Sequence, residues 1–334
     1  QKETTTGQDI VELTNRLRRL PEVEAVSISV NARPYIGSNS GIRFRLDTLV
    51  RSPLRRPVTP EFFQVFRYQS ADGQGYQPLM QAIKNGNAVL SENIWPDGYK
   101  GDRTLLGKEV VNVDDSTDVY KIAAVSTKVR YNDFWPNYSD RYMAIPLTEA
   151  QLAEINDDLY PLNTEVCLRV KPNTAPGFPE RLMEQSDTQF SVGNLFILKV
   201  HDYEMIREDY NRTNVNQMQT RFWMMGFLLE NILLGIVGTF WFRTQHRRGE
   251  LGLRVAVGST RMGLWHRLNK EGLLLLALAA FPAAIICYNI GYLELTEGGI
   301  EWSIIRFLIT FCVTSLLMAL MILIGIWFPA RQAI

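Results

Sequence analysis

The sequence lacks the short motifs that most often mark an enzyme. No GxxxxGK[ST] stretch is present, so the chain has no phosphate-cradling loop of its own. Neither HExxH nor GxSxG occurs, and His201, His246 and His266 are scattered along the chain. The three cysteines also lack the spacing of a metal site. These absences argue against ATP hydrolysis, metal-dependent proteolysis and serine esterase chemistry, so we predict no catalytic residue and no metal ligand.

The chain has no excess charge of either sign, since 35 Lys and Arg balance 35 Asp and Glu. It also has no segment that interleaves cations with base-stacking aromatics, so no nucleic-acid partner is predicted. The balanced overall composition conceals two parts of different polarity. Up to about Arg221 the sequence is polar and mixed, whereas from Phe222 onward apolar residues arrive in blocks of about twenty.

Three apolar blocks cover residues 222–242, 273–293 and 307–328. Each is close to the roughly 20 residues that a helix needs to cross a hydrocarbon core of about 30 Å. The third contains no ionisable side chain. We therefore predict three transmembrane helices at these positions.

The charges of the connecting loops predict the orientation. Residues 243–272 carry seven Lys and Arg against two Glu. In residues 294–302, by contrast, every charged residue is acidic. By the positive-inside bias, the 243–272 loop and the 329–334 end lie in the cytoplasm. Residues 1–221 and the short 294–306 loop then lie outside.

An exported domain of this size needs a signal for export, yet Gln1 begins directly with polar sequence. We expect a further transmembrane helix to precede Gln1 in the full protein. That expectation gives a four-helix topology whose first helix is missing from this numbering.

The outer domain, residues 1–201, is predicted to be α+β. Residues 9–20 have helical spacing, whereas 23–30, 41–50, 119–131, 141–147 and 164–172 have strand character. Thr59 and Thr148 are predicted to cap short helices over 59–68 and 148–155. Residues 202–221 contain no proline or glycine and are interpreted as a stalk helix that continues into the bilayer; a helix lying on the membrane surface is the alternative.

The basic loop contains two short half-apolar pieces separated by AVGST, residues 256–260. Gly258 permits a turn, and Ser259 or Thr260 can cap the helix that follows. In that helix Met262, Trp265 and Leu268 share one face. Either it lies at the membrane interface, or it docks into a groove of a cytoplasmic partner with Trp265 as the anchor.

Glu230 and Asn231 are polar residues inside the first apolar block. An acidic side chain at that depth costs about 2.5–3.5 kcal/mol on insertion scales for the comparable Asp, so it normally faces a partner or water. Helix packing across a dimer or near Asn231 is one interpretation, and contact with a substrate or lipid headgroup is the other.

The run RRGELGLRVAVGSTRMGLWHRLNKEGLLL, residues 247–275, closely resembles the cytoplasmic signature of the MacB and FtsX group of ABC transporter permeases. FPARQAI, residues 328–334, resembles the motif that closes these proteins. LPEVEAVSIS (20–29), VTPEFFQVF (58–66), NAVLSENIW (87–95) and YKIAAVSTKVRYNDF (120–134) resemble successive landmarks of their periplasmic core domain.

The resemblance implies a bacterial inner-membrane permease, with its large domain in the periplasm, that works as a dimer with a second copy or a paralogue. It implies a partner ABC ATPase that supplies ATP and Mg, no directly bound cofactor, and a coupling helix over residues 260–270. The implied ATPase-coupling residues are Glu250, Gly252, Arg254, Gly258, Arg261, Leu264, Trp265 and Leu268.

The implied function is mechanotransmission, in which a partner's ATP hydrolysis drives movement of the periplasmic domains. Such proteins export a peptide, amphiphile or lipoprotein, in some cases with a periplasmic or outer-membrane partner. The alternative is an FtsX-like signalling subunit that regulates a cell-wall hydrolase. The size of the outer domain favours the first function.

Overall fold

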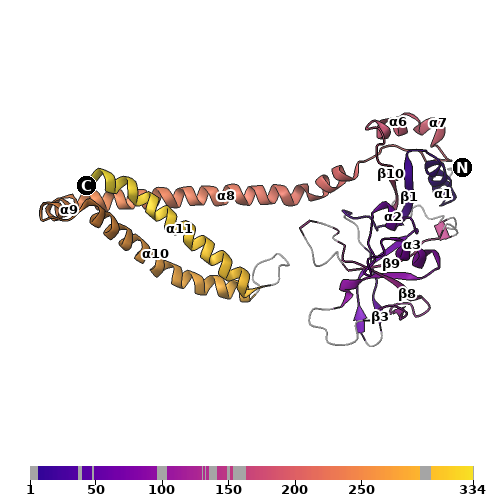
Figure 1. Cartoon of the computed structure of the whole chain (residues 1–334), viewed down its shortest axis with the longest axis horizontal. Coiled ribbons are helices and arrows are strands. Elements are labelled where there is room, and N and C mark those ends of the chain that lie inside the picture. Colours follow the sequence, from indigo (N-terminus) through magenta and orange to yellow (C-terminus); the bar gives the residue numbers. More distant parts are fainter. Residues whose placement is uncertain are drawn as a thin grey trace. The chain divides into compact units, whose positions relative to one another are not determined.

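The computed structural model describes residues 7–36, 40–46, 49–95, 104–129, 131, 133–134, 141–148, 151–152, 163–293 and 302–333. The side chains of Leu251, Arg261 and residues 328–333 are not among those described. The chain forms two compact units, residues 1–214 and residues 215–334 (Figure 1). We call them the N-terminal unit and the C-terminal unit.

The N-terminal unit is built on a mixed sheet, in which the described strands follow the order β10-β1-β5-β9-β6-β8-β7-β3-β4, with β2 added to β5. The pairs β5–β9 and β6–β8 are parallel, whereas β1 is antiparallel to both neighbours. The strands are β1 Val23–Val30, β2 Ser40–Gly41, β3 Phe44–Leu46, β4 Leu49–Arg51, β5 Leu54–Val58, β6 Ala88–Ser91, β7 Glu109–Asn112, β8 Val119–Ser126, β9 Tyr142–Pro146 and β10 Thr164–Val170.

Short helices accompany this sheet. They are α1 Gly7–Arg18, α2 Phe62–Val65, α3 Gln77–Lys84, the 3-10 helix η1 Glu92–Ile94, α6 Phe178–Glu184 and α7 Ser186–Gln189. The apolar residues of α1 pack with β1, α6 and Phe190, which follows α7, and Leu17 and Val26 are buried there. Because α1 is only 12 residues long, its stability depends on this packing rather than on helix propensity.

Alternate residues of the central strands bury on opposite faces of the sheet, as the period of two requires. Val89 and Ala144 join the cluster that contains α2 and α3. Leu90 and Met143, their sequence neighbours, join a second cluster with β3, β7 and β8. Two buried layers therefore enclose these strands, which explains why the strand sequences read as continuously apolar.

Several predicted elements are confirmed, and others are shorter or differently divided. The strand over 23–30 is confirmed as β1. The single strand predicted over 41–50 is wrong, because Phe44 pairs with Arg51 and Leu46 with Leu49 in an antiparallel hairpin. Asp47 is a residue type that favours turns, and the expectation of one continuous strand ignored it. The predicted 119–131 strand ends at Ser126.

The two predicted helix caps have different outcomes. Thr148 and Gln151 form a reciprocal capping box, with Thr148 Oγ1 accepting from the Gln151 amide at 3.1 Å and Gln151 Oε1 accepting from the Thr148 amide at 2.9 Å. Thr59 does not cap α2, because its Oγ1 accepts from the Ile28 amide at 3.0 Å instead. Most of the predicted 148–155 helix lies outside the described residues.

The C-terminal unit contains long helices. They are α8 Tyr203–His246, whose first turns belong to the N-terminal unit, α9 Arg248–Ala256, α10 Arg261–Tyr292 and α11 Ile304–Ala333. Three of these are long and apolar enough to cross a membrane, over 203–246, 262–292 and 304–327. The α+β unit followed by a helical membrane bundle is the predicted architecture, and the helix expected before Gln1 stays a prediction.

Close contact between the bundle helices is made possible by glycine. A Cβ built on Gly272 of α10 would lie 2.7 Å from Ile322 Cγ2 and 3.0 Å from Ile326 Cδ1, both on α11. A Cβ on Gly325 of α11 would lie 2.8 Å from Ile236 Cγ2 of α8. Small residues at such positions let helix backbones approach closely in lipid, where packing replaces the hydrophobic effect between helices.

Candidate coupling site

The predicted coupling loop folds as α9, a tight turn and the start of α10. Gly258 lies in the turn with φ of +101°, a conformation that other residues rarely adopt. Thr260 then caps α10, since its Oγ1 accepts from the Gly263 amide at 3.1 Å. The sequence therefore predicted both the break in the helix and its cap correctly.

Within α9, Glu250 and Arg254 lie one turn apart and form an ion pair of 2.6 Å between Glu250 Oε1 and Arg254 Nη2. The Arg254 hydrogen bond lowers the pKa of Glu250, and the nearby charges of Arg254, Arg247 and Arg267 lower it further. The carboxylate therefore stays ionised, and the pair braces the exposed side of α9. Gly252 has open space where a Cβ would be, so no packing contact requires glycine there.

The helix predicted over 260–270 is not a separate element. It forms the first turns of α10, which continues without a break to Tyr292. Arg261 is the first residue of that helix, and its side chain lies outside the described residues. A load applied at the turn would thus act directly on the part of α10 that precedes Pro282, the proline inside this helix.

The apolar face of this segment faces inward. Leu264 and Leu268 are buried, and Leu268 packs with Phe240, Ile322 and Ile326 of the neighbouring helices. Trp265 is partly buried against the same cluster. The hypothesis that Trp265 is a free docking anchor is therefore not favoured by the geometry, since its ring already packs against the bundle.

The exposed apolar residues of the loop are different ones. Leu253 is 66% exposed, Val257 82% and Met262 62%. We call these three residues the turn patch. Sequence reasoning missed Leu253 and Val257. Their position beside the glycine turn was a signal of exposure, because apolar residues next to a tight turn have few neighbouring side chains to pack against.

Glu230 and Asn231 occupy exposed positions on α8. Asn231 Nδ2 donates to the Phe227 carbonyl of its own helix at 2.7 Å. Within the described part of the chain, Glu230 has no ion-pair or hydrogen-bond partner. Its proposed partner across a dimer stays a prediction.

A second cluster, which the sequence did not reveal, surrounds the start of α8 in the N-terminal unit. Asp133 accepts three hydrogen bonds, from Arg207 Nε at 2.9 Å, Asn211 Nδ2 at 2.7 Å and Tyr35 Oη at 3.1 Å. Tyr203 Oη donates to the Pro34 carbonyl at 2.8 Å. We call this cluster the α8 root. Its hydrogen-bonded pairs are 74 to 169 residues apart in sequence, which is why no local pattern could predict it.

The α8 root holds one face of the helix, because its α8 members lie at positions 203, 207, 210 and 211. Tyr35 packs edge-to-face on Tyr203 and on Tyr210, with ring centroids 6.1 and 6.0 Å apart. The Arg207 guanidinium lies 5.8 Å from the Tyr35 ring centroid. The Arg207 hydrogen bond lowers the pKa of Asp133, and those from Tyr35 and Asn211 lower it further.

The loop that carries Tyr35 is itself held rigidly. Glu165 of β10 accepts from the amides of Ala32 and Arg33 at 3.0 and 2.9 Å through Oε2. Asn31 and Tyr35 have positive φ values of 48° and 57°, which is uncommon for residues with a Cβ. The sheet thus fixes an unusual loop conformation that presents Tyr35 and the Pro34 carbonyl to α8.

Tyr131 belongs to the aromatic segment YNDFWPNY (131–138), of which 132 and 135–138 lie outside the described residues. Its buried ring lies 3.3 Å from the Arg56 guanidinium carbon, and its hydroxyl accepts from Tyr68 Oη at 2.7 Å. Tyr131 therefore packs within its own domain. Among the described residues, no group of three or more His, Cys, Asp or Glu is arranged to hold a metal ion.

Comparison with known proteins gives a family. The family model of the MacB-like periplasmic core domain matches residues 1–177. No curated protein matches the chain.

Two solved structures are similar to the chain. The periplasmic region of MacB from Actinobacillus actinomycetemcomitans has 10% identity and a TM-score of 0.38, over 64% of this chain and 85% of that one. The extracellular domain of the noncanonic ABC-type transporter YknZ from Gram-positive bacteria has 14% identity and a TM-score of 0.36, over 57% and 84%. Because the family match spans more than half of the sequence, the chain belongs to the MacB/FtsX-like ABC transporter permeases.

Proposed function

We propose that this chain is the permease subunit of an ATP-driven mechanotransmission transporter. Membership of the ABC permeases implies an ABC ATPase partner, which would bind the ATP and Mg while the permease itself performs no catalysis. The observation that carries the proposal is α8, one helix of 44 residues that begins in the α8 root and ends at His246, beside the arginine-rich turn. A helix of about twelve turns is stiff, so displacement at one end reaches the other.

The cytoplasmic contact in this proposal is the turn patch together with the charges of α9. Leu253, Val257 and Met262 give a small apolar anchor, and Glu250 and Arg254 lie beside it. Apolar centres with polar rims are the usual anatomy of protein interfaces. Closure of the ATPase would move this turn, and α8 and α10 both start or end there.

The output of the proposed cycle is movement of the periplasmic unit. The α8 root would transmit it, because Asp133, Arg207 and Tyr35 bind the helix to loops that the sheet holds in place. The proposed setting is the bacterial inner membrane, with two permease copies or paralogues per transporter. The proposed cargo is a peptide, an amphiphile or a lipoprotein taken from the periplasm or outer leaflet.

The test is to co-express the full-length membrane protein with its ATPase and to measure co-purification and ATP hydrolysis. Leu253→Asp with Val257→Asp should lower both, since a charge is placed in the anchor. Leu293→Asp is the matched control, because Leu293 is equally exposed but follows the opposite end of α10. Unchanged co-purification in the double variant would overturn the assignment of the turn patch.

A second variant separates transport from signalling. Asp133→Ala should leave ATPase binding intact and abolish the periplasmic output. If the complex hydrolyses ATP and moves no cargo, but activates a cell-wall hydrolase in a manner that depends on Asp133, the signalling alternative is correct. An ATPase-free complex would contradict both.

A further inference from the structure

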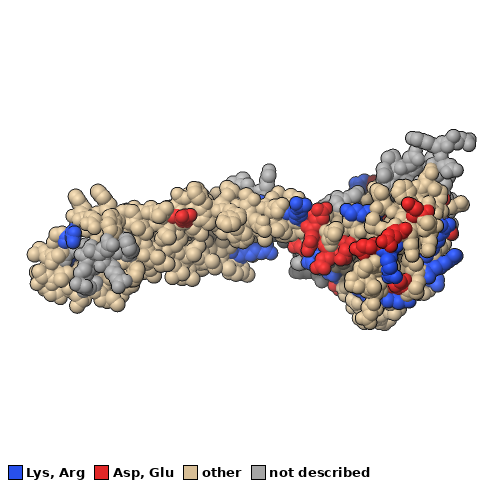
Figure 2. All heavy atoms as spheres, turned by 90° about the horizontal axis from the view of Figure 1, so that it is seen from above, with Lys and Arg blue, Asp and Glu red and all other residues tan. Residues whose placement is uncertain are grey.

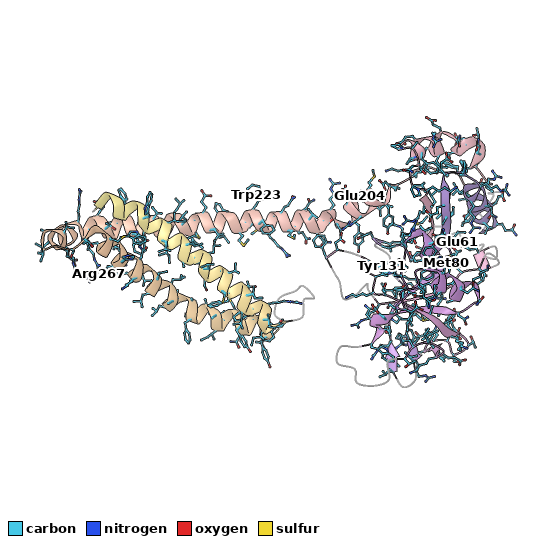
Figure 3. All side chains as sticks on the ribbon, viewed as in Figure 1. Glu61, Met80, Tyr131, Glu204, Trp223 and Arg267 are labelled. Atoms are coloured by element: carbon cyan, nitrogen blue, oxygen red, sulfur yellow. The ribbon has the colours of Figure 1, made fainter. Side chains whose placement is uncertain are left out.

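A small recess lies in the C-terminal unit where α8 ends, α9 begins and α10 starts, close to the labelled Arg267 (Figure 3). Its volume is about 30 Å³, which is room for one or two water-sized groups. The recess is lined by Phe240, Arg243, Thr244, Arg247, Glu250, Arg254, Leu264, Arg267, Leu268 and Glu271. Four arginines from three helices therefore converge on one opening.

The charges of this recess are not balanced. Arg254 pairs with Glu250 at 2.6 Å, and Arg247 Nη1 lies 3.7 Å from Glu271 Oε1. In the part of the chain that the structure describes, neither Arg243 nor Arg267 forms an ion pair, although the charge of Arg267 is close enough to lower the pKa of Glu250. The four arginines and two glutamates of the recess therefore leave two positive charges without a counter-charge. The charge of Arg247 also lowers the pKa of Glu250.

The remaining wall of the recess is apolar and buried. Phe240, Leu264 and Leu268 supply it, and Thr244 donates its hydroxyl to the Phe240 carbonyl of its own helix at 2.6 Å. Arg243 lies near the end of the 203–246 span and Arg267 near the start of the 262–292 span. The recess therefore lies at the depth where two spans leave the hydrocarbon, which is the depth of phospholipid headgroups.

The size and chemistry of the recess restrict its ligand. The recess is too small to enclose a whole lipid or nucleoside, so only a compact anionic group of a larger molecule would reach its arginines. Arginine forks favour carboxylate or phosphate oxygens. Of the two, phosphate is abundant at headgroup depth, and basic recesses between transmembrane helices bind anionic headgroups.

We infer that this recess binds the phosphate of an anionic phospholipid, in the leaflet on the side of the 243–272 loop. Arg243 and Arg267 are the two ligands, and the paired arginines form the positively charged rim. The inference does not depend on the proposed function, because it concerns lipid and no ATPase. A bound lipid would tie the end of α8 to the start of α10.

The test uses the full-length protein in detergent, stripped of native lipid and titrated with phosphatidylglycerol or phosphatidylcholine, with bound lipid counted by native mass spectrometry. Phosphatidylglycerol should bind in preference. Arg243→Gln with Arg267→Gln should weaken it by about 30-fold, because each cation near an anionic headgroup contributes about 1 kcal/mol, or about fivefold in affinity. Arg248→Gln with Lys270→Gln is the matched control, since both residues are exposed, in the same loop and outside the recess.

Three results would overturn the inference. Equal losses in the two double variants would mean a diffuse basic surface rather than a site. Competition by inorganic phosphate at the concentration of the lipid would mean a free-anion site. Unchanged lipid binding in the Arg243 and Arg267 variant, with loss of ATPase co-purification, would assign the recess to an acidic partner protein.

Discussion

The two units of this chain use the same apolar residue types in opposite ways. In the N-terminal unit, Phe62, Phe63 and Leu79 are fully buried within the sheet domain. In the C-terminal unit, Trp223 is 81% exposed and Leu278 73%. Charged side chains gather over the sheet domain and are sparse on the helices (Figure 2). Burial alone thus does not distinguish a core residue, because the second unit has lipid as its solvent.

The strongest test of this contrast is a matched pair of truncations. Phe62→Ala should destabilise the sheet domain by about 3–5 kcal/mol, because a fully buried ring packed on Phe63 and Tyr68 is lost. Trp223→Ala should leave the domain unchanged. The measurement is urea unfolding of the full-length protein, followed by hydrogen exchange of its strands. Similar losses in both variants would contradict the division into two environments.

The bundle has its own packing, which glycine substitutions would reveal. Gly272→Leu should destabilise the helices by about 1–3 kcal/mol, because its side chain would collide with Ile322 and Ile326. Gly235→Leu, where a Cβ meets nothing within 4 Å, is the control and should be neutral. Thermal aggregation in detergent measures both. A neutral Gly272→Leu would show that the contact of α10 with α11 is loose.

The α8 root should matter more than an exposed ion pair. Asp133→Ala removes three hydrogen bonds and should speed amide exchange in the first turns of α8, by the equivalent of about 1–3 kcal/mol. Asp114→Ala breaks only an exposed pair with Arg43 and should cost at most about 1 kcal/mol. Equal effects would remove the root from the proposed path of transmission.

The smallest effect is expected from pH. The folded-state pKa of Asp133 is lowered below the ordinary value of an aspartate, so its stabilising contribution is complete above the unfolded pKa. The contribution is lost as pH falls through the lower, folded pKa. The contribution of Asp133 to the protection of the first turns of α8 should therefore stay constant between about pH 5 and 8. A difference between wild type and Asp133→Asn that changes within that range would contradict this assignment.

Local features were predictable because their causes are local. The 23–30 strand follows from alternation, the break at Gly258 from glycine, and the Thr260 cap from its hydroxyl at a helix start. The hairpin of Phe44 with Arg51 was missed because a run of strand-forming residues outweighed a single turn-forming Asp in the prediction. Thr59 was misassigned because its hydroxyl binds a strand 31 residues away.

The sequence by itself determined the two solvents, the three spans and the turn between α9 and α10, because each depends on length, composition or a residue's own backbone preference. Only the tertiary structure decided which face of α10 is buried, that Asp133 receives Arg207 and Tyr35, and that four arginines meet at one recess. These outcomes depend on contacts between residues far apart in the chain. No periodicity within one segment carries that information.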